Sequence, residues 1–225
     1  MNKVGYLICG DTHIPRRATA IPPLLLQKME EVHQSLPAQK FEEVLFTGDL
    51  VNDPNVLSPL KPFVDERGVE YVSGNMDYQI KPRPAQELVF LQTFDGQFAQ
   101  GLKLGLIHGH QIQPRGDLEN LTTYAKELEV NILVSGHTHA DCCEISEDKR
   151  ILLLNPGSLT GAWSFLATGL PSFQTLILTF NPKQNSSDYI RCKISTYYLQ
   201  EDEILHEEAH FSFQAGFFKT QKPKF

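Results

Sequence analysis

The chain has little cysteine, no excess of basic charge and no long apolar run, and each shortage excludes a class of protein. Its 225 residues include only four cysteines, whose spacing fits neither a zinc motif nor a disulfide framework. We therefore expect reduced thiols, as in a cytosolic protein. Twenty basic residues stand against 27 acidic ones, giving a net charge of −7. This balance argues against a nucleic-acid partner, which favours a basic surface.

Membrane-spanning and secretory classes are excluded in the same way. No stretch approaches the roughly 18 apolar residues that a membrane-spanning helix needs. The apolar run at 4–9 is followed at once by Gly-Asp-Thr-His, which is not the pattern of a signal peptide. We expect a cytoplasmic protein that reaches membranes only through a partner.

Short apolar runs alternate with helical patterns in the first half of the chain. The runs at 4–9, 44–46 and 69–72 predict buried strands. Apolar residues at 25, 29, 32 and 36 predict a helix that begins near Pro22 and Pro23. A second helix is expected at 55–64, although Pro59 and Pro62 disfavour it.

The second half is richer in strands. A helix capped by Asp117 is expected, and the expected strands cover 88–94, 102–107, 132–134, 142–147, 151–154, 173–180, 189–199 and 204–213. Strand–helix alternation followed by consecutive strands predicts an α/β fold, a four-layer α/β/β/α sandwich of two mixed sheets flanked by helices. One domain is expected at 1–213, with turns at 95–96 and 181–188 and a flexible tail at 214–225.

Five short polar clusters follow apolar runs, at the points where buried strands would end. They are Gly10-Asp11-Thr12-His13, Gly48-Asp49, Gly74-Asn75, His108-Gly109-His110 and Gly136-His137-Thr138-His139. Two divalent ions about 3.5–4 Å apart can bind a phosphate and activate a water, and they need a bridging carboxylate with nitrogen or oxygen ligands on each side. Because imidazole is abundant here, Mn²⁺, iron or Zn²⁺ fits better than Mg²⁺ or Ca²⁺, and we favour Mn²⁺ or Zn²⁺.

Each cluster alone has a simpler explanation. Asp11 can cap a helix, Asp49 and Asn75 can close turns, and His108 or His110 can end a strand without a function. We favour a common site because all five clusters occur together and in order.

The clusters resemble the signature of the calcineurin-like metallophosphoesterases. By that resemblance Asp11, His13 and His139 hold one metal ion, and Asn75, His108 and His137 hold the other. Asp49 would bridge the two ions.

Further segments are similar to the vacuolar protein sorting 29 family, the small subunit of retromer. They are His13–Pro15, Gly105–Gln111 with Pro114 and Gly116-Asp117, Ile132–His139, Asn155–Ala162 and Pro171–Phe173. This resemblance implies a subunit for endosomal protein sorting and retrograde transport, cytoplasmic and peripheral on endosomal membranes. Its metal-site face would dock onto the long α-solenoid subunit of retromer.

The same resemblance implies two partner surfaces. Ile112 and Pro114 would belong to the interface with the solenoid. A separate apolar patch would recruit regulator proteins, with Tyr197 or Tyr198 as candidates. Adjacent strand residues point to opposite faces, so only one tyrosine can be exposed there, and local packing of both is an equal alternative.

One position departs from the active enzymes of the superfamily. Many of them carry histidine after the asparagine, where it protonates the leaving group, whereas this chain has Met76, which cannot. Asp77 is nearby and could contribute in its place, but nothing in the sequence shows that it does. The sequence therefore favours a sorting scaffold that binds metal. The alternative is a Mn²⁺- or Zn²⁺-dependent phosphodiesterase, in which Arg16, Arg17 and Arg115 either bind phosphate or are ordinary solvated surface.

Overall fold

We describe the protein from a computed structural model that covers residues 1–36, 41–52, 54–64, 68–94, 97–167, 169–180 and 189–221. The turns expected at 95–96 and 181–188, and residues 222–225 of the expected tail, lie outside the described residues.

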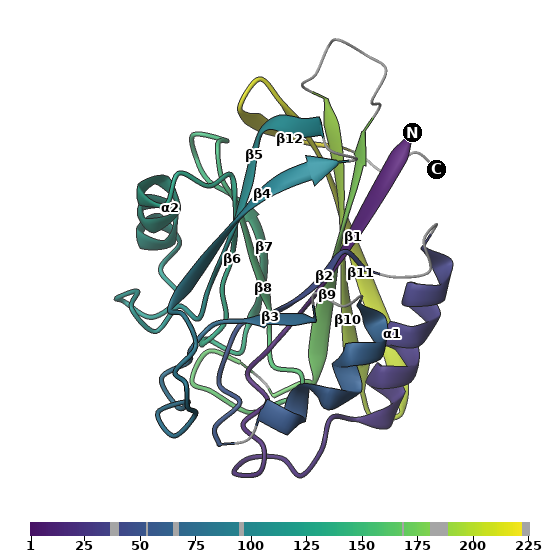
Figure 1. The fold of residues 1–225 in the computed structure, drawn as a ribbon, viewed down its shortest axis with the longest axis vertical. Coiled ribbons are helices and arrows are strands. Elements are labelled where there is room, and N and C mark those ends of the chain that lie inside the picture. Colours follow the sequence, from purple (N-terminus) through teal and green to yellow (C-terminus); the bar gives the residue numbers. More distant parts are fainter. Residues whose placement is uncertain are drawn as a thin grey trace.

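The larger sheet has seven strands in the order β12-β11-β10-β9-β1-β2-β3 (Figure 1). Three of them are parallel neighbours and the rest pair antiparallel. Their bounds are β1 Asn2–Cys9, β2 Glu43–Phe46, β3 Val69–Tyr71, β9 Ser172–Phe180, β10 Ile190–Gln200, β11 Glu203–Gln214 and β12 Phe217–Thr220.

The smaller sheet has five strands in the order β4-β5-β6-β8-β7. Its central strands β5, β6 and β8 are parallel, and both edge strands pair antiparallel. Their bounds are β4 Glu87–Phe94, β5 Gln97–Ile107, β6 Ile132–Val134, β7 Asp141–Ile145 and β8 Leu152–Pro156.

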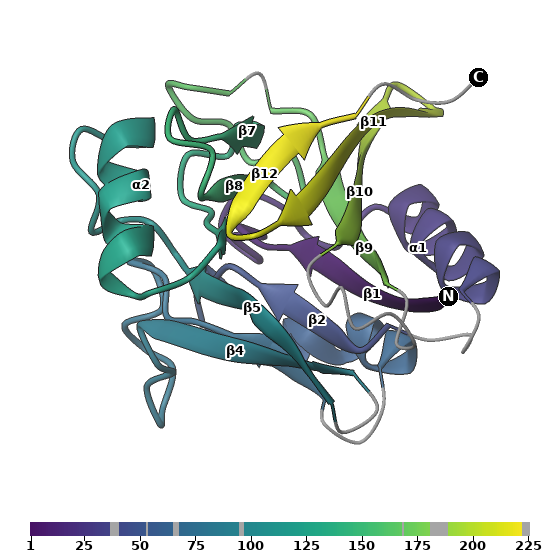
Figure 2. The same cartoon turned by 90° about the horizontal axis from the view of Figure 1, so that it is seen from above.

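The sheets stack face to face, and helices cover their outer faces (Figures 1 and 2). Helix α1 (Pro23–Ser35) and the 3₁₀ helix η1 (Pro54–Phe63) cover the larger sheet, whereas α2 (Leu118–Glu127) covers the smaller one. The predicted four-layer sandwich is therefore confirmed. Alternation along β1 explains the layers, because Tyr6 and Ile8 pack between the sheets while Leu7 and Cys9 pack under α1.

The forms of η1 and α2 follow from particular residues in their sequences. Pro59 and Pro62 lie inside η1 and lack the N–H that an α-helix would use, which fits its 3₁₀ form. The Asp117 side chain caps α2 by accepting a hydrogen bond from the Asn120 N–H at 2.8 Å, as expected.

All four cysteines are free. No helix within the described ranges is long and apolar enough to cross a membrane.

The fold brings the carboxyl ends of strands from both sheets to one place. Strands β1, β2 and β3 run parallel in one sheet, and β5 and β6 run parallel in the other. Hydrogen bonds between the loops after β1 and β6, and between those after β2 and β5, join the two sets of ends. The polar clusters of the sequence lie in these loops.

The structure corrects the flexible tail for residues 214–221. Strand β12 pairs with β11, and Phe218 is fully buried with its ring 4.9 Å from that of Phe213. The Phe218 N–H also donates to the Lys149 carbonyl at 2.6 Å, which ties β12 to the loop between β7 and β8. A four-residue strand carries too short an alternation to stand out in sequence, and its order comes from this distant packing.

We predict that Phe218→Ala lowers the free energy of unfolding by about 3–5 kcal/mol, because a buried aromatic ring is lost and a cavity is left. The matched control is Phe217→Ala, since Phe217 lies next to it on the strand with 41% of its surface exposed. Urea unfolding of both variants measures the difference. If Phe218→Ala lowers the free energy of unfolding no more than Phe217→Ala does, burial of Phe218 adds nothing to stability.

Candidate metal centre

Strained loops at the strand ends present the predicted ligands. Five of the seven ligand residues have left-handed backbone conformations with φ between 48° and 68°, namely Asp11, His13, Asp49, His137 and His139. Non-glycine residues adopt this region at a cost, and such strain gathers at functional sites where the surrounding structure enforces it.

Neighbouring glycines make room for the carboxylates. A Cβ on Gly136 would lie 2.4 Å from Asp11 Oδ2, and one on Gly74 would lie 2.1 Å from Asp49 Oδ1. Both distances are below any contact that a carbon atom tolerates. The carboxylates therefore occupy the space that a side chain at either glycine would fill, as the pairing of glycine with ligand residues in the sequence suggested.

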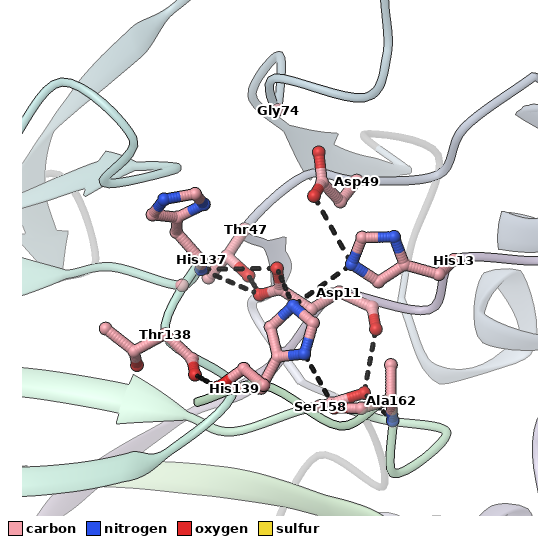
Figure 3. Close-up of polar contacts among 12 residues, drawn as sticks. Asp11, His13, Thr47, Asp49, Gly74, His137, Thr138, His139, Ser158 and Ala162 are labelled. Carbon is pink, nitrogen blue, oxygen red and sulfur yellow. Dashed lines mark hydrogen bonds and ion pairs between the residues drawn. The ribbon is translucent and has the colours of Figure 1, made fainter. Parts of the chain in front are cut away.

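Four buried side chains point toward one another at the centre of the site (Figure 3). His13 Nε2 lies 3.0 Å from His139 Nε2 and 3.3 Å from Asp49 Oδ2, and His139 Nε2 lies 3.4 Å from Asp11 Oδ1. One ligand atom from each of the four residues falls within 4.8 Å of the others. This is the grouping of donor atoms that surrounds a single metal ion.

The imidazoles are oriented so that their Nε2 atoms face the site. Nδ1 of His139 lies 2.6 Å from the Ala162 carbonyl, and Nδ1 of His108 lies 2.8 Å from the Thr47 carbonyl. A carbonyl only accepts, so each Nδ1 carries a proton, and each Nε2 offers its lone pair to a metal ion once the ring is neutral. Such backbone contacts are the usual outer support of a histidine ligand.

A second group of ligands lies on the other side of Asp49. His108 Nε2 is 3.1 Å from Asn75 Oδ1 and 3.5 Å from Asp49 Oδ1, and the His137 ring centre is 5.1 Å from that of His108. Asp49 thus directs Oδ2 toward His13 and Oδ1 toward His108. One carboxylate facing two ligand groups has the disposition of a bridge between two ions.

Burial sets the protonation of the site. Burial lowers the pKa of His13 to about 4 and that of His137 to about 3, so both rings are neutral at pH 7. Burial also raises the pKa of Asp49 to about 6. Burial opposes ionisation of Asp11, but the His139 hydrogen bond and the nearby imidazoles outweigh it and lower the pKa of Asp11 to about 2.

Asp77 is a supporting residue that the sequence did not assign correctly. Its side chain is fully buried and accepts hydrogen bonds from the backbone N–H groups of Asp49, Val51 and Gly74 at 2.7–2.8 Å. Both oxygens therefore hold the β2 and β3 loops together. This arrangement leaves Asp77 without the free oxygen that a substitute for the missing histidine would need.

The Asn155–Ser158 segment supports the ligand loops from the opposite side. The Asn155 amide donates to the Gly136 carbonyl and to Thr138 Oγ1, both at 3.0 Å. Ser158 Oγ donates to the Asp11 carbonyl at 2.8 Å. The motif that the sequence offered only as a resemblance is thus a brace for the Asp11 and His137–His139 loops, a role that contacts distant in sequence define.

The partner-surface candidates lie in different environments. Ile112 is only 4% exposed and packs beneath α2, so the expectation that its side chain forms a docking surface is wrong, whereas Pro114 is exposed. Tyr197 stacks on Phe173 at 4.7 Å on the α1 side of the sheet. The Tyr198 hydroxyl lies 2.9 Å from an Asp141 carboxylate oxygen, so the two tyrosines are held separately and both are half-buried.

Met76 and the three arginines differ in what they contact. The backbone N–H of Met76 donates to Asp49 Oδ1 at 2.8 Å, so this residue orients the bridging carboxylate through its backbone. Arg16 donates to the Tyr78 hydroxyl at 2.7 Å, Arg17 donates to the Trp163 carbonyl at 3.2 Å, and Arg115 donates to the His137 carbonyl.

Comparison with known proteins assigns this arrangement to a family. Residues 4–177 match the model of the calcineurin-like phosphoesterase superfamily domain. The chain belongs to the calcineurin-like phosphoesterase superfamily. It is 37% identical over 155 residues to a "Probable metallophosphoesterase" of Methanothermobacter thermautotrophicus, covering 68% of this chain and 76% of that protein.

Two solved structures resemble the fold over nearly the whole chain. Vacuolar protein sorting 29 of Cryptosporidium parvum has a TM-score of 0.75 and 27% identity, covering 93% of this chain and 98% of that one. Vps29 of Entamoeba histolytica, solved with Zn²⁺, has a TM-score of 0.70 and 30% identity, covering 92% and 99%. Divalent metals are typical of the superfamily, and the donor set of this chain fits them.

We predict that the affinity of the metal-free protein for Mn²⁺ falls by at least about tenfold per pH unit below pH 6. The raised pKa of Asp49 means that it is protonated below about pH 6, so a proton must leave before a metal ion binds. Burial opposes protonation of His139, but its contact with Asp11 outweighs burial and raises the pKa of His139, so this ring releases a proton as well. His13 and His137 are already neutral there and release none. Titration calorimetry at pH 5, 6 and 7 measures the slope, and equal affinities at pH 5 and 7 would contradict it.

Proposed function

We propose that this chain is a divalent-metal-dependent phosphoesterase that hydrolyses phosphodiesters. The observation that carries the proposal is the Asp49 carboxylate, which directs one oxygen to His13 and the other to His108. A carboxylate placed between two imidazole-rich ligand groups is what a pair of divalent ions requires. The archaeal relative, at 37% identity, supports the same chemistry.

The residues divide between two ions, Mn²⁺ or Zn²⁺ by their nitrogen-rich donor set. Asp11, His13 and His139 would hold one ion, Asn75, His108 and His137 the other, and Asp49 would bridge. Two such ions, when bound, polarise the phosphate oxygens and lower the pKa of a water molecule. The Vps29 structure with Zn²⁺ supports the ability of this fold to bind that ion.

The protein contributes orientation and charge. The Nδ1–H contacts of His108 and His139 fix both rings with Nε2 directed inward. Thr47 Oγ1 and the His137 N–H donate to the Asp11 carboxylate at 3.1–3.2 Å, which holds it ionised and in place. Because Met76 cannot donate a proton to a leaving group, we infer that the best substrates release a stable anion, such as an aryloxide.

We predict Mn²⁺-dependent hydrolysis of bis(4-nitrophenyl) phosphate. Asp49→Asn and His108→Ala should each lower kcat/KM by about 100-fold or more, because loss of even an outer support of a metal ligand costs 10–100-fold. The matched control is Asp148→Asn, an exposed aspartate paired with Lys126, which should retain activity. Chelation should abolish turnover, and added Mn²⁺ should restore it. Turnover unaffected by the chelator or by Asp49→Asn would refute the proposal.

A second candidate function is that of a retromer-type sorting subunit. An apolar rim beside the metal centre favours it, with Trp163 62%, Phe165 93% and Leu166 51% exposed. These residues follow Ala162, whose carbonyl supports His139. The two Vps29 structures also support this candidate, because their match to this chain covers 98–99% of their own length.

In this candidate the apolar rim docks onto the long α-solenoid subunit of retromer. The partner would bring the chain from the cytoplasm to endosomal membranes. Regulator proteins would use a separate surface on the α1 side of the larger sheet, where Tyr197 is half-buried.

We predict that Phe165→Asp weakens binding to a retromer solenoid subunit of the same organism at least about tenfold, since exposed aromatic residues dominate such interfaces. Leu118→Asp on α2 is the control, because Leu118 is 46% exposed but lies outside the rim. Titration calorimetry with the purified subunit gives both affinities. Absence of binding by the wild-type chain would remove this candidate.

A further inference from the structure

Two arginine side chains donate hydrogen bonds to backbone carbonyls near the metal ligands. The Arg115 guanidinium donates to the carbonyl of the ligand His137. Arg17 donates to the Trp163 carbonyl at 3.2 Å and lies 5.7 Å from the Trp163 ring centre. Trp163 adjoins Ala162, whose carbonyl supports His139. Arg115 thus contacts a ligand loop directly, and Arg17 contacts the residue next to the one whose carbonyl supports His139.

Neither cation forms an ion pair within the part of the chain that the structure describes, where no carboxylate lies within ion-pair distance of Arg17 or Arg115. The Arg115 Nε is buried and has no hydrogen-bond partner. A buried donor without an acceptor costs free energy and is rare in folded proteins.

The Arg115 guanidinium has donor capacity that the protein does not use. It contacts the His137 carbonyl through one nitrogen and leaves its buried Nε without an acceptor. An anion that accepted from this guanidinium would satisfy the unused donor and offset the positive charge.

Resting on the proposed function, we propose that Arg115 and Arg17 bind the non-bridging oxygens of the substrate phosphate. The substrate class is a phosphate ester that keeps at least one ionised oxygen. Guanidinium groups bind such oxygens through paired, charge-assisted hydrogen bonds. Arg16 is not included, because it donates to the Tyr78 hydroxyl and lies 5.8 Å from that ring centre, with no contact to a ligand loop among its described contacts.

The test is calorimetric titration of the Mn²⁺-loaded protein with inorganic phosphate, together with steady-state kinetics on bis(4-nitrophenyl) phosphate. Arg115→Ala and Arg115→Gln should weaken phosphate binding and raise KM by about 10- to 100-fold, the effect of losing a charge-assisted contact, with kcat changed only a few-fold. Arg17→Ala should act in the same direction. Arg150→Ala, which removes an exposed arginine stacked 5.3 Å from the Phe217 ring centre, is the matched control and should change neither.

Arg115→Gln is included because an amide N–H can still donate to the His137 carbonyl and preserve the ligand loop. If both Arg115 variants lose bound Mn²⁺, Arg115 positions His137 and the phosphate-binding role is refuted. Phosphate affinities within twofold of wild type in the metal-loaded variants also refute it. A wild-type protein without turnover removes the proposed function, while the phosphate affinities still decide the role of Arg115.

Discussion

The rest of the site depends on one buried carboxylate, that of Asp11. It follows β1 in the larger sheet, accepts the Thr47 hydroxyl from the β2 loop, and accepts the His137 N–H from the smaller sheet. An ionised group with no exposed surface must be compensated by hydrogen bonds and opposite charge. Asp11 therefore fixes the distance between the two sheets at the end where the ligands meet.

This constraint explains the surrounding sequence. Gly136 has no side chain because the Asp11 carboxylate occupies that space. Ser158 holds the Asp11 carbonyl, so the segment after β8 contacts the loop after β1 although 147 residues separate them. The left-handed conformations of the ligand residues are local costs that Asp77 and Asn155 offset with buried hydrogen bonds to the loops. Both proposed functions, phosphoesterase and docking subunit, would use this rigid end of the sandwich.

The sequence predicted what local pattern encodes. Apolar runs located β1, β2 and β6, and the polar cluster after each run located Asp11, Asp49 and His137, because parallel strands end together. The sequence pattern did not predict contacts between segments that lie far apart in the chain. Asp77 was a candidate to replace the missing histidine, and only its three backbone N–H donors reveal that it holds the ligand loops together. Burial of Ile112 under α2 and of Phe218 against Phe213 likewise depends on packing partners that no local pattern names.

The central claim is that this end of the sandwich binds two divalent ions bridged by Asp49. The most direct measurement is a crystal structure of the protein grown with Mn²⁺, with anomalous difference density recorded at the manganese edge. The account predicts two peaks about 3.5–4 Å apart, one contacting His13 and His139, the other contacting His108 and Asn75, with Asp49 between them. A single peak, or peaks that leave Asp49 uncontacted, would contradict it.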